Sequence, residues 1–441
     1  MSFEEEAKLI EDKLTSSDDN REVKAAIEAV LSIAGPWADE ADLLNAAELM
    51  ETAVEAASRI EEPRLAAFVL DQKAQLLTQF DLPAEALAAI DRAIEVVEGD
   101  PPVQQDLSIR RTVVMAKMGR LSEAINQLRP IIESLETDEA DGQRLRLLGL
   151  LGNFHLRAGQ NQQAQAVFEQ ALTLTDSNAY PTQFAKLQLG LSQALAGQEK
   201  YREAQTVLLE QLLIASTSDL AMDTWDLLAP AIEVSHQLQD WPTLAKLTNQ
   251  AIELSSRQGN YQEANMHREN LISVLMRQGQ LHEAKAQLEI ALDYARRKGP
   301  AERKLVHLMS LGRVCFEMGD LEASEKYYTQ ALEAAERQGH ERSVITVLGR
   351  MGALLAEREA LDEALEYGKK AVEGAERVDD PLILAEQLVL LALTYRDLNL
   401  TDKASSASQR AAELYQQLGE VDFAHRALQI QREAEEKLQT N

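Results

Sequence analysis

The chain has little of what would point to a secreted, membrane-bound or metal-binding protein. Its 441 residues include one cysteine, Cys315, which excludes an internal disulfide and a zinc site built from thiolates. No apolar run is long enough to span a bilayer, and acidic residues follow Met1 where a targeting segment would carry basic ones. We therefore predict a cytoplasmic protein that has no membrane partner.

Patterns that carry chemistry are missing too. The seven histidines are scattered, and no two of them stand four residues apart around a glutamate, as they do in zinc proteases. No glycine-rich loop follows a strand, because no segment alternates apolar and polar residues as a strand does. Cys315 falls at an apolar position of a helix, where a buried and unreactive thiol is expected. The sequence thus predicts a non-enzymatic protein with no cofactor, metal or catalytic site.

Positive charge is in short supply. The chain has 44 lysine and arginine residues against 73 aspartate and glutamate residues, so its net charge is −29 at pH 7. A charge of this sign repels nucleic-acid phosphate and anionic lipid. We predict no nucleic-acid partner, and any anionic partner would need a locally basic surface.

What the chain has instead is a small residue every forty positions. A second small residue follows seven positions later in most repeats, and seven residues are two helical turns, so both lie on one face of a helix. A small side chain kept at one face means that another helix passes close by, as in stacked helical hairpins. The first small residue of each pair stands at Ala124, Ala164, Ala204, Ala284, Ala364 and Ala404, with Leu244 and Ser324 at the two positions between.

One repeat can be followed in full between Arg303 and Gly339. Apolar residues keep helical spacing up to Met318, and Gly319 then interrupts the pattern. A second helical run begins at Leu321 and ends in a basic turn before Gly339, which is a helix stop. Each repeat is therefore two helices of about 17 residues, about 25 Å long. The same spacing places inner turns at Gly119, Gly159, Gly279 and Gly319.

These repeats resemble the tetratricopeptide repeat family. Their length of forty residues is similar to that of the subgroup with extended helices. HEAT-type repeats have a similar length but lack the glycine turn and the paired small residues. The residues that carry the resemblance are Leu151 and Gly152 with Ala164, Phe168 and Ala171, Leu311 and Gly312 with Tyr328 and Ala331, and Gly352 with Ala364 and Ala371.

The resemblance implies an all-α fold, a right-handed α-solenoid or superhelix of about ten tetratricopeptide-like helical hairpins. We place an acidic N-terminal cap or tail at residues 1–20 and a C-terminal capping helix at residues 416–441. Between them, residues 21–415 form the solenoid of about ten forty-residue repeats.

The resemblance also implies a binding surface, because the first helix of each repeat lines the concave groove of such a superhelix. Arginine there can hold carboxylates in a bidentate manner. Alternatively these side chains are ordinary solvated residues paired with nearby acids, as Arg313 and Glu317 are placed to be. The residues predicted to face the groove are Arg146, Asn153, Arg157, Lys186, Asn270, Arg277, Arg313, Arg350 and Arg396.

The function favoured by this pattern is that of a protein-interaction scaffold or adaptor that holds a protein or peptide segment, in particular an acidic one. Arg277, Arg313 and Arg350 come from three successive first helices and are expected to form one basic strip. An alternative is a regulatory protein that senses a ligand or peptide in the same groove. A third hypothesis is a structural subunit that self-associates through its end caps. The sequence leaves the partner and the oligomeric state open.

Overall fold

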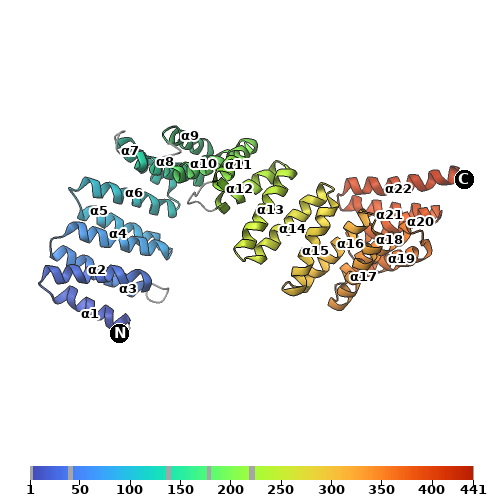
Figure 1. Cartoon of the computed structure of the whole chain (residues 1–441), viewed down its shortest axis with the longest axis horizontal. Helices are drawn as coiled ribbons and strands as arrows, with labels where there is room; N and C mark the ends of the chain where they lie inside the picture. Colours follow the sequence, from blue (N-terminus) through green and yellow to red (C-terminus); the bar gives the residue numbers. More distant parts are fainter. Residues whose placement is uncertain (1–2, 38–42, 136–140, 176–179, 218–223, 441) are drawn as a thin grey trace. The chain divides into compact units, whose positions relative to one another are not determined.

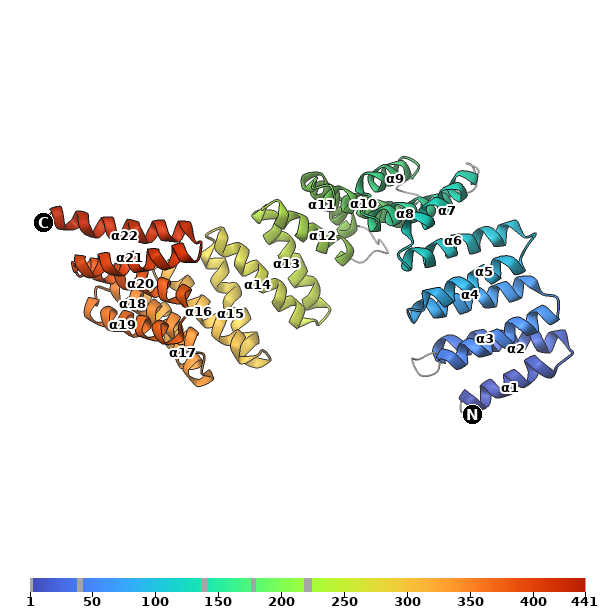
Figure 2. The ribbon, with the colours of Figure 1, turned by 180° about the vertical axis from the view of Figure 1, so that it is seen from behind.

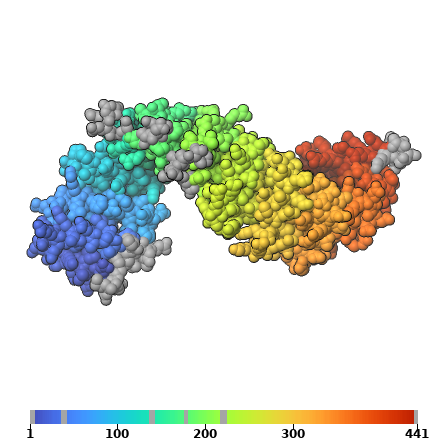
Figure 3. Space-filling model, viewed as in Figure 1, coloured from blue at the N-terminus to red at the C-terminus, as the bar shows by residue number. Residues whose placement is uncertain are grey.

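The protein is helical throughout the part of the chain that the computed structural model describes, namely residues 3–37, 43–135, 141–175, 180–217 and 224–440. The chain divides into two compact units, Met1–Leu238 and Gln239–Asn441. In each unit successive helices run back and forth and pack side by side (Figures 1 and 2). The predicted all-α solenoid fold is confirmed. Side chains fill the spaces between the ribbons of neighbouring helices (Figure 3).

The helices of the N-terminal unit begin and end close to the boundaries that the repeat predicts. They are α1 (Phe3–Ser16), α2 (Asn20–Trp37), α3 (Leu43–Arg59), α4 (Pro63–Gln79), α5 (Pro83–Val96), α6 (Pro101–Lys117), α7 (Leu121–Ser134), α8 (Asp141–Arg157), α9 (Asn161–Thr173), α10 (Pro181–Ala196), α11 (Tyr201–Thr217) and α12 (Thr224–Gln237).

The helices of the C-terminal unit are more uniform, and most have the expected length of 17 residues. They are α13 (Trp241–Arg257), α14 (Tyr261–Arg277), α15 (Leu281–Arg297), α16 (Ala301–Glu317), α17 (Leu321–Gln338), α18 (Glu341–Glu357), α19 (Leu361–Val378), α20 (Pro381–Asp397), α21 (Thr401–Gln417) and α22 (Val421–Thr440).

The turn inside each hairpin is set by one residue in the left-handed backbone conformation. This residue recurs every forty positions, and its φ lies between 54° and 78°. Glycine adopts that conformation without strain, whereas other residues do so at a cost. The predicted glycine turns are confirmed, and the same geometry continues where glycine is missing. The eight residues are Gly119, Gly159, Glu199, Gln239, Gly279, Gly319, Glu359 and Asn399.

The small residues that recur every forty positions lie in the core of the hairpins. Ala164, Ala284 and Ala364 are fully buried, as is Ser324. Cys315 is also fully buried, and burial raises the pKa of its thiol, as expected for an unreactive cysteine. The core is therefore a series of contacts between neighbouring helices, each extending only to the next hairpin.

The even-numbered helices are the first helices of the hairpins, and they approach one another along one side of each stack. In the C-terminal unit α18 contacts α20 and α20 contacts α22, and in the N-terminal unit α8 contacts α10. Among the described helices no comparable contact joins α17 to α19 or α19 to α21, whereas at the start of the N-terminal unit α1 does contact α3. A stack whose first helices are closer together than its second helices curves toward the first helices. That side is therefore the inner side of each unit.

The helices at the ends of the chain pack on their neighbours. Ile10 and Leu14 of α1 are buried, and Arg59 of α3 donates a hydrogen bond of 2.6 Å to the carbonyl oxygen of Leu14. At the other end Ala427 and Ile430 of α22 are buried in a cluster with α20 and α21. No described helix combines the length and the apolar character needed to cross a membrane.

Candidate partner-binding surface

A row of exposed side chains follows the inner side of the first helices. In a helix of 17 residues, positions 6, 10, 13 and 17 lie on one side, because they are spaced by three or four residues. We call this row in α6, α8 and α10 the N-terminal face, and the same row in α14, α16, α18 and α20 the C-terminal face. Most residues predicted to line the groove occupy these positions.

Four predicted residues lie on the N-terminal face, and all four are exposed. Arg146, Asn153 and Arg157 take positions 6, 13 and 17 of α8, and Lys186 takes position 6 of α10. Arg157 donates a hydrogen bond of 2.8 Å to the carbonyl oxygen of Ala116, which links α8 to α6. Arg146, Asn153 and Lys186 make no hydrogen bond or ion pair with any described residue. Their polar groups are therefore available to a partner.

The three arginines of the expected strip differ in their surroundings. The guanidinium of Arg277 lies 5.5 Å from the ring centre of Trp241, and Arg313 Nε is 2.8 Å from Glu317 Oε1. Arg350 forms no hydrogen bond or ion pair within the described residues, although its charge acts on Glu386. Because they occupy positions 17, 13 and 10, the three side chains step back by about one helical turn from each first helix to the next.

The other two predicted residues lie in the same unit. Asn270 is exposed at position 10 of α14. Arg396 occupies position 16 of α20, one residue away from the exposed row, and is half-buried. Its guanidinium nitrogens lie 2.9 Å from Glu433 Oε2 and 3.1 Å from Asp397 Oδ1. Arg396 thus holds α22 against α20, and its donors are already engaged.

The two faces differ in charge. The C-terminal face carries the cations Arg277, Arg313 and Arg350. Its carboxylates are at least as numerous, namely those of Glu317, Glu357, Glu386 and Asp397. The N-terminal face has one carboxylate, that of Asp106. Its cations are Arg110, Lys117, Arg146, Arg157 and Lys186.

Sequence reasoning missed Arg110 and Lys117. They stand at positions 10 and 17 of α6, the same positions that it examined in later repeats. α6 keeps the forty-residue spacing of the later repeats, because Asp141 of α8 lies forty residues after Pro101. If positions are counted from the first residue of each helix, the exposed positions of α8 correspond to positions of α6 that include both residues.

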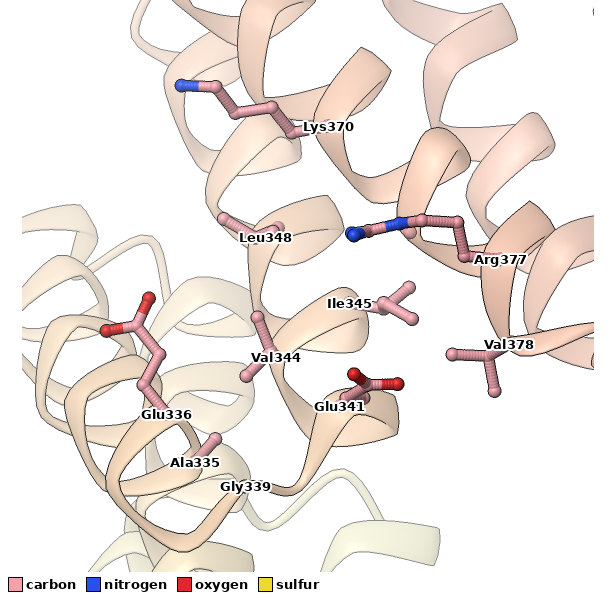
Figure 4. Close-up of a pocket in the computed structure, with 11 residues that line it drawn as sticks. Ala335, Glu336, Gly339, Glu341, Val344, Ile345, Leu348, Lys370, Arg377 and Val378 are labelled. Atoms are coloured by element: carbon pink, nitrogen blue, oxygen red, sulfur yellow. The ribbon is translucent and has the colours of Figure 1, made fainter.

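A hollow of about 540 Å³ opens on the other side of the C-terminal unit, between α17, α18 and α19. Gly374 is one of its lining residues and packs tightly on Ile345, since a Cβ added there would lie 2.8 Å from Ile345 Cγ1. Figure 4 shows Arg377 reaching across the opening above Ile345, whereas Lys370 points away. Lys370 is in addition paired with Glu366 at 2.6 Å.

Two smaller hollows lie along the first helices. One of about 320 Å³ borders the N-terminal face between α4, α5 and α6. The other, of about 260 Å³, lies in the C-terminal unit and is lined by Arg350, Glu386 and Arg426 together with the rings of Tyr415 and Phe423, whose centres are 5.4 Å apart. Desolvation raises the pKa of Glu386, and the charge of Arg350 opposes the shift.

Two family models, each described as a tetratricopeptide repeat, match residues 145–178 and 262–337 of this chain. These segments are tetratricopeptide repeats. The first contains most of α8 with α9, and the second contains most of α14 with α15, α16 and most of α17. The tetratricopeptide matches thus include Arg146, Asn153 and Arg157 of the N-terminal face and Arg277 and Arg313 of the C-terminal face.

Solved structures with a similar arrangement of helices include the apo form of RapI, which is 12% identical with a TM-score of 0.41, over 76% of this chain and 99% of that chain. Another holds kinesin-light-chain-like tetratricopeptide repeats from Podospora anserina, 16% identical with a TM-score of 0.38 over 43% and 95%. Aspartyl phosphate phosphatase F from Bacillus subtilis is 12% identical, with a TM-score of 0.37 over 74% and 92%. Likenesses at this level carry no information about partners. No curated protein matches the chain in sequence.

Proposed function

We propose that this chain is a non-enzymatic scaffold of the cytoplasm that binds a segment of a partner protein along its first helices. The observation that carries the proposal is the row of exposed side chains on the inner side of each unit. Arg146, Asn153, Lys186 and Arg350 present polar groups that no described residue engages. A surface of this kind gains charge-assisted hydrogen bonds from a partner without first breaking internal ones.

A regulatory protein that senses a small ligand or peptide is the second candidate. The hollow between α18, α20 and α22 favours it, because Arg350, Glu386 and Arg426 meet there beside two aromatic rings. Such a site offers charges of both signs and an apolar wall within one small volume, which suits a compact ligand. Binding there would bridge three first helices and so alter their spacing.

We also propose that the chain belongs to the forty-residue subgroup of tetratricopeptide proteins, with residues 1–20 and 416–441 as end caps of a solenoid over 21–415. The forty-residue recurrence of the left-handed turn residue supports the length of the repeat. The buried apolar residues of α1 and α22 support the caps, since each covers the last hairpin at its end.

Capture of the partner from the native cell, followed by charge reversal on the two sides of the helices, tests the scaffold. The variants that should weaken capture are Arg146→Glu with Lys186→Glu on the N-terminal face and Arg313→Glu with Arg350→Glu on the C-terminal face. The matched control is Lys326→Glu with Lys369→Glu, since both lysines are exposed on second helices. Capture that only the control weakens would contradict the proposal.

A further inference from the structure

We propose that the N-terminal face, together with the hollow beside it, binds a partner segment in which an apolar side chain is followed by carboxylates. The proposal rests on the scaffold function above and gives it a place and a chemistry. Under this proposal acidic segments bind to the N-terminal unit. The sequence had instead favoured the strip of Arg277, Arg313 and Arg350 in the C-terminal unit.

Charge is the first argument. The N-terminal face holds five cations and one carboxylate, in a chain whose net charge is −29. A random sample of this surface would be acidic, so a local excess of positive charge concentrates attraction for an anionic segment. The C-terminal face has no such excess, because the acids of α16, α18 and α20 accompany its arginines.

The hollow is the second and independent argument. Its apolar walls come from Ala74 in α4, Ile90 in α5, and Val113 and Val114 in α6. Its volume of about 320 Å³ accommodates one large aliphatic or aromatic side chain. Val113, at position 13 of the N-terminal face, remains 36% exposed, so apolar surface is open to a partner there.

Cations border this apolar hollow, so the positive charge and the exposed apolar surface lie at the same place. Arg110 and Lys117 of α6 line it, one helical step to either side of Val113. An apolar residue that enters the hollow would bring a neighbouring carboxylate of the same segment within reach of one of them. An apolar ligand without negative charge would partly desolvate both cations and give neither a new partner, which is unfavourable.

The cations are already held in place. Asp71 is buried, and its Oδ2 accepts a hydrogen bond from Gln75 Nε2 and lies 3.0 Å from a guanidinium nitrogen of Arg110. Lys117 Nζ lies 3.5 Å from the carbonyl oxygen of Thr78. Each contact uses some of the donors and leaves others for a ligand. Fixed donors lose less conformational entropy when a partner binds.

The order of the helices gives the spacing of the partner segment. From the hollow, the cations follow on α6, then on α8 and then on α10. The first helices α8 and α10 contact each other. Packed helices have axes about 10 Å apart, and an extended chain covers about 3.3 Å per residue, so about three residues cross from α8 to α10. The expected pattern is an apolar residue with carboxylates at about every third position after it.

The probe for the experiment is a synthetic peptide with one leucine and then glutamate at every third position, with serine between and fluorescein at the far end. Its fluorescence anisotropy is titrated with the full chain at low salt. We expect saturable binding that weakens about tenfold or more for Arg146→Glu with Lys186→Glu, since two attractive contacts become repulsive. Val113→Glu, and replacement of the peptide's leucine by serine, should each weaken binding about tenfold.

The matched control is Lys326→Glu with Lys369→Glu, which makes the same change of charge at exposed lysines of second helices and should leave peptide affinity within about twofold. All substituted residues are exposed, and circular dichroism and thermal melts verify that the variants fold. Equal affinity of the leucine and serine peptides would overturn the apolar anchor. Equal binding of single-stranded DNA of the same charge, insensitive to Val113→Glu, would show a general polyanion surface and overturn the proposal.

The native partner separates this inference from the scaffold function. Capture that depends on Arg146 and Lys186 supports both. Capture that depends on Arg313 and Arg350 alone overturns the inference and leaves the scaffold function in place. Capture that neither pair of reversals weakens contradicts the scaffold function, whatever the synthetic peptide does.

Discussion

The hydroxyl of Ser324 in α17 donates a hydrogen bond of 2.8 Å to the carbonyl oxygen of Gly312 in α16. Ser324 stands where most repeats have alanine, so the first atoms of its side chain touch the backbone of the neighbouring helix. The next hairpin has the same close contact, since a Cβ added at Gly352 would lie 3.2 Å from the carbonyl oxygen of Ala364. This closeness is the physical reason for the small residue at this position in most repeats.

Ala364→Leu should therefore destabilise the protein by about 1–3 kcal/mol, because the larger side chain forces α18 and α19 apart. Glu366→Gln, two residues away on the exposed surface of α19, loses only a solvent-screened ion pair with Lys370 and should change stability little. Chemical denaturation of both variants measures the difference. Equal free energies of unfolding would show that Ala364 does not lie at a tight helix contact.

Glu359→Gly should stabilise the protein by about 1 kcal/mol, because Glu359 adopts a φ of 62° that glycine tolerates better. The control is Glu357→Gly, two residues earlier in the last turn of α18, where glycine should cost about 1 kcal/mol. Thermal melts compare the two variants with the parent chain. A lower melting temperature for Glu359→Gly would contradict the explanation of the turn.

Glu51 should make stability depend on acid pH. Its carboxylate oxygens lie 2.6 Å from Arg92 Nη2 and 2.6 Å from Lys73 Nζ, so the residue ties α3 to α4 and α5. The Arg92 hydrogen bond is the largest cause that lowers the pKa of Glu51 from its usual 4.5 to about 2, partial burial opposes it, and Lys73 adds to the lowering. Because the folded pKa is depressed, this contribution is complete above pH 4.5 and disappears as the pH falls toward 2.

Glu51→Gln should accordingly lower the free energy of unfolding by about 1 kcal/mol at pH 7, a value discounted because the ion pairs are partly exposed. The difference from the parent chain should shrink as the pH falls from 4.5 toward 2. Glu48→Gln, on an exposed side chain of the same helix, is the control. A difference that persists unchanged at low pH would mean that the charge of Glu51 is not its source.

The repeat made much of the fold predictable. Small residues and left-handed turns recur every forty positions. Each is needed by the backbone geometry at its own position, so the residue type in the sequence shows it directly. The contacts of single side chains are not local in this sense. Trp241 and Arg277 are separated by a helical hairpin's length of chain, as are Arg396 and Glu433, and only folding brings each pair together.

Only part of the candidate surface could be predicted, because some of it depends on contacts that form when the chain folds. Exposure of Arg146, Asn153 and Lys186 follows from their positions in first helices. Which other arginines already have partners depends on contacts between helices, and these engage Arg157 and Arg396 but leave Arg350 open. The basic character of the N-terminal face was itself predictable, because Lys117 lies forty residues before Arg157 and Arg110 lies two helical turns before Lys117 in the same first helix.

Photocrosslinking to the captured native partner tests the central claim most directly. A photoreactive phenylalanine replaces Asn153, which is exposed on the first helix α8, or Glu169, which is exposed on the second helix α9 of the same hairpin. If the partner binds along the first helices, irradiation links it through position 153 and not through position 169. Crosslinking through position 169 alone would contradict the account.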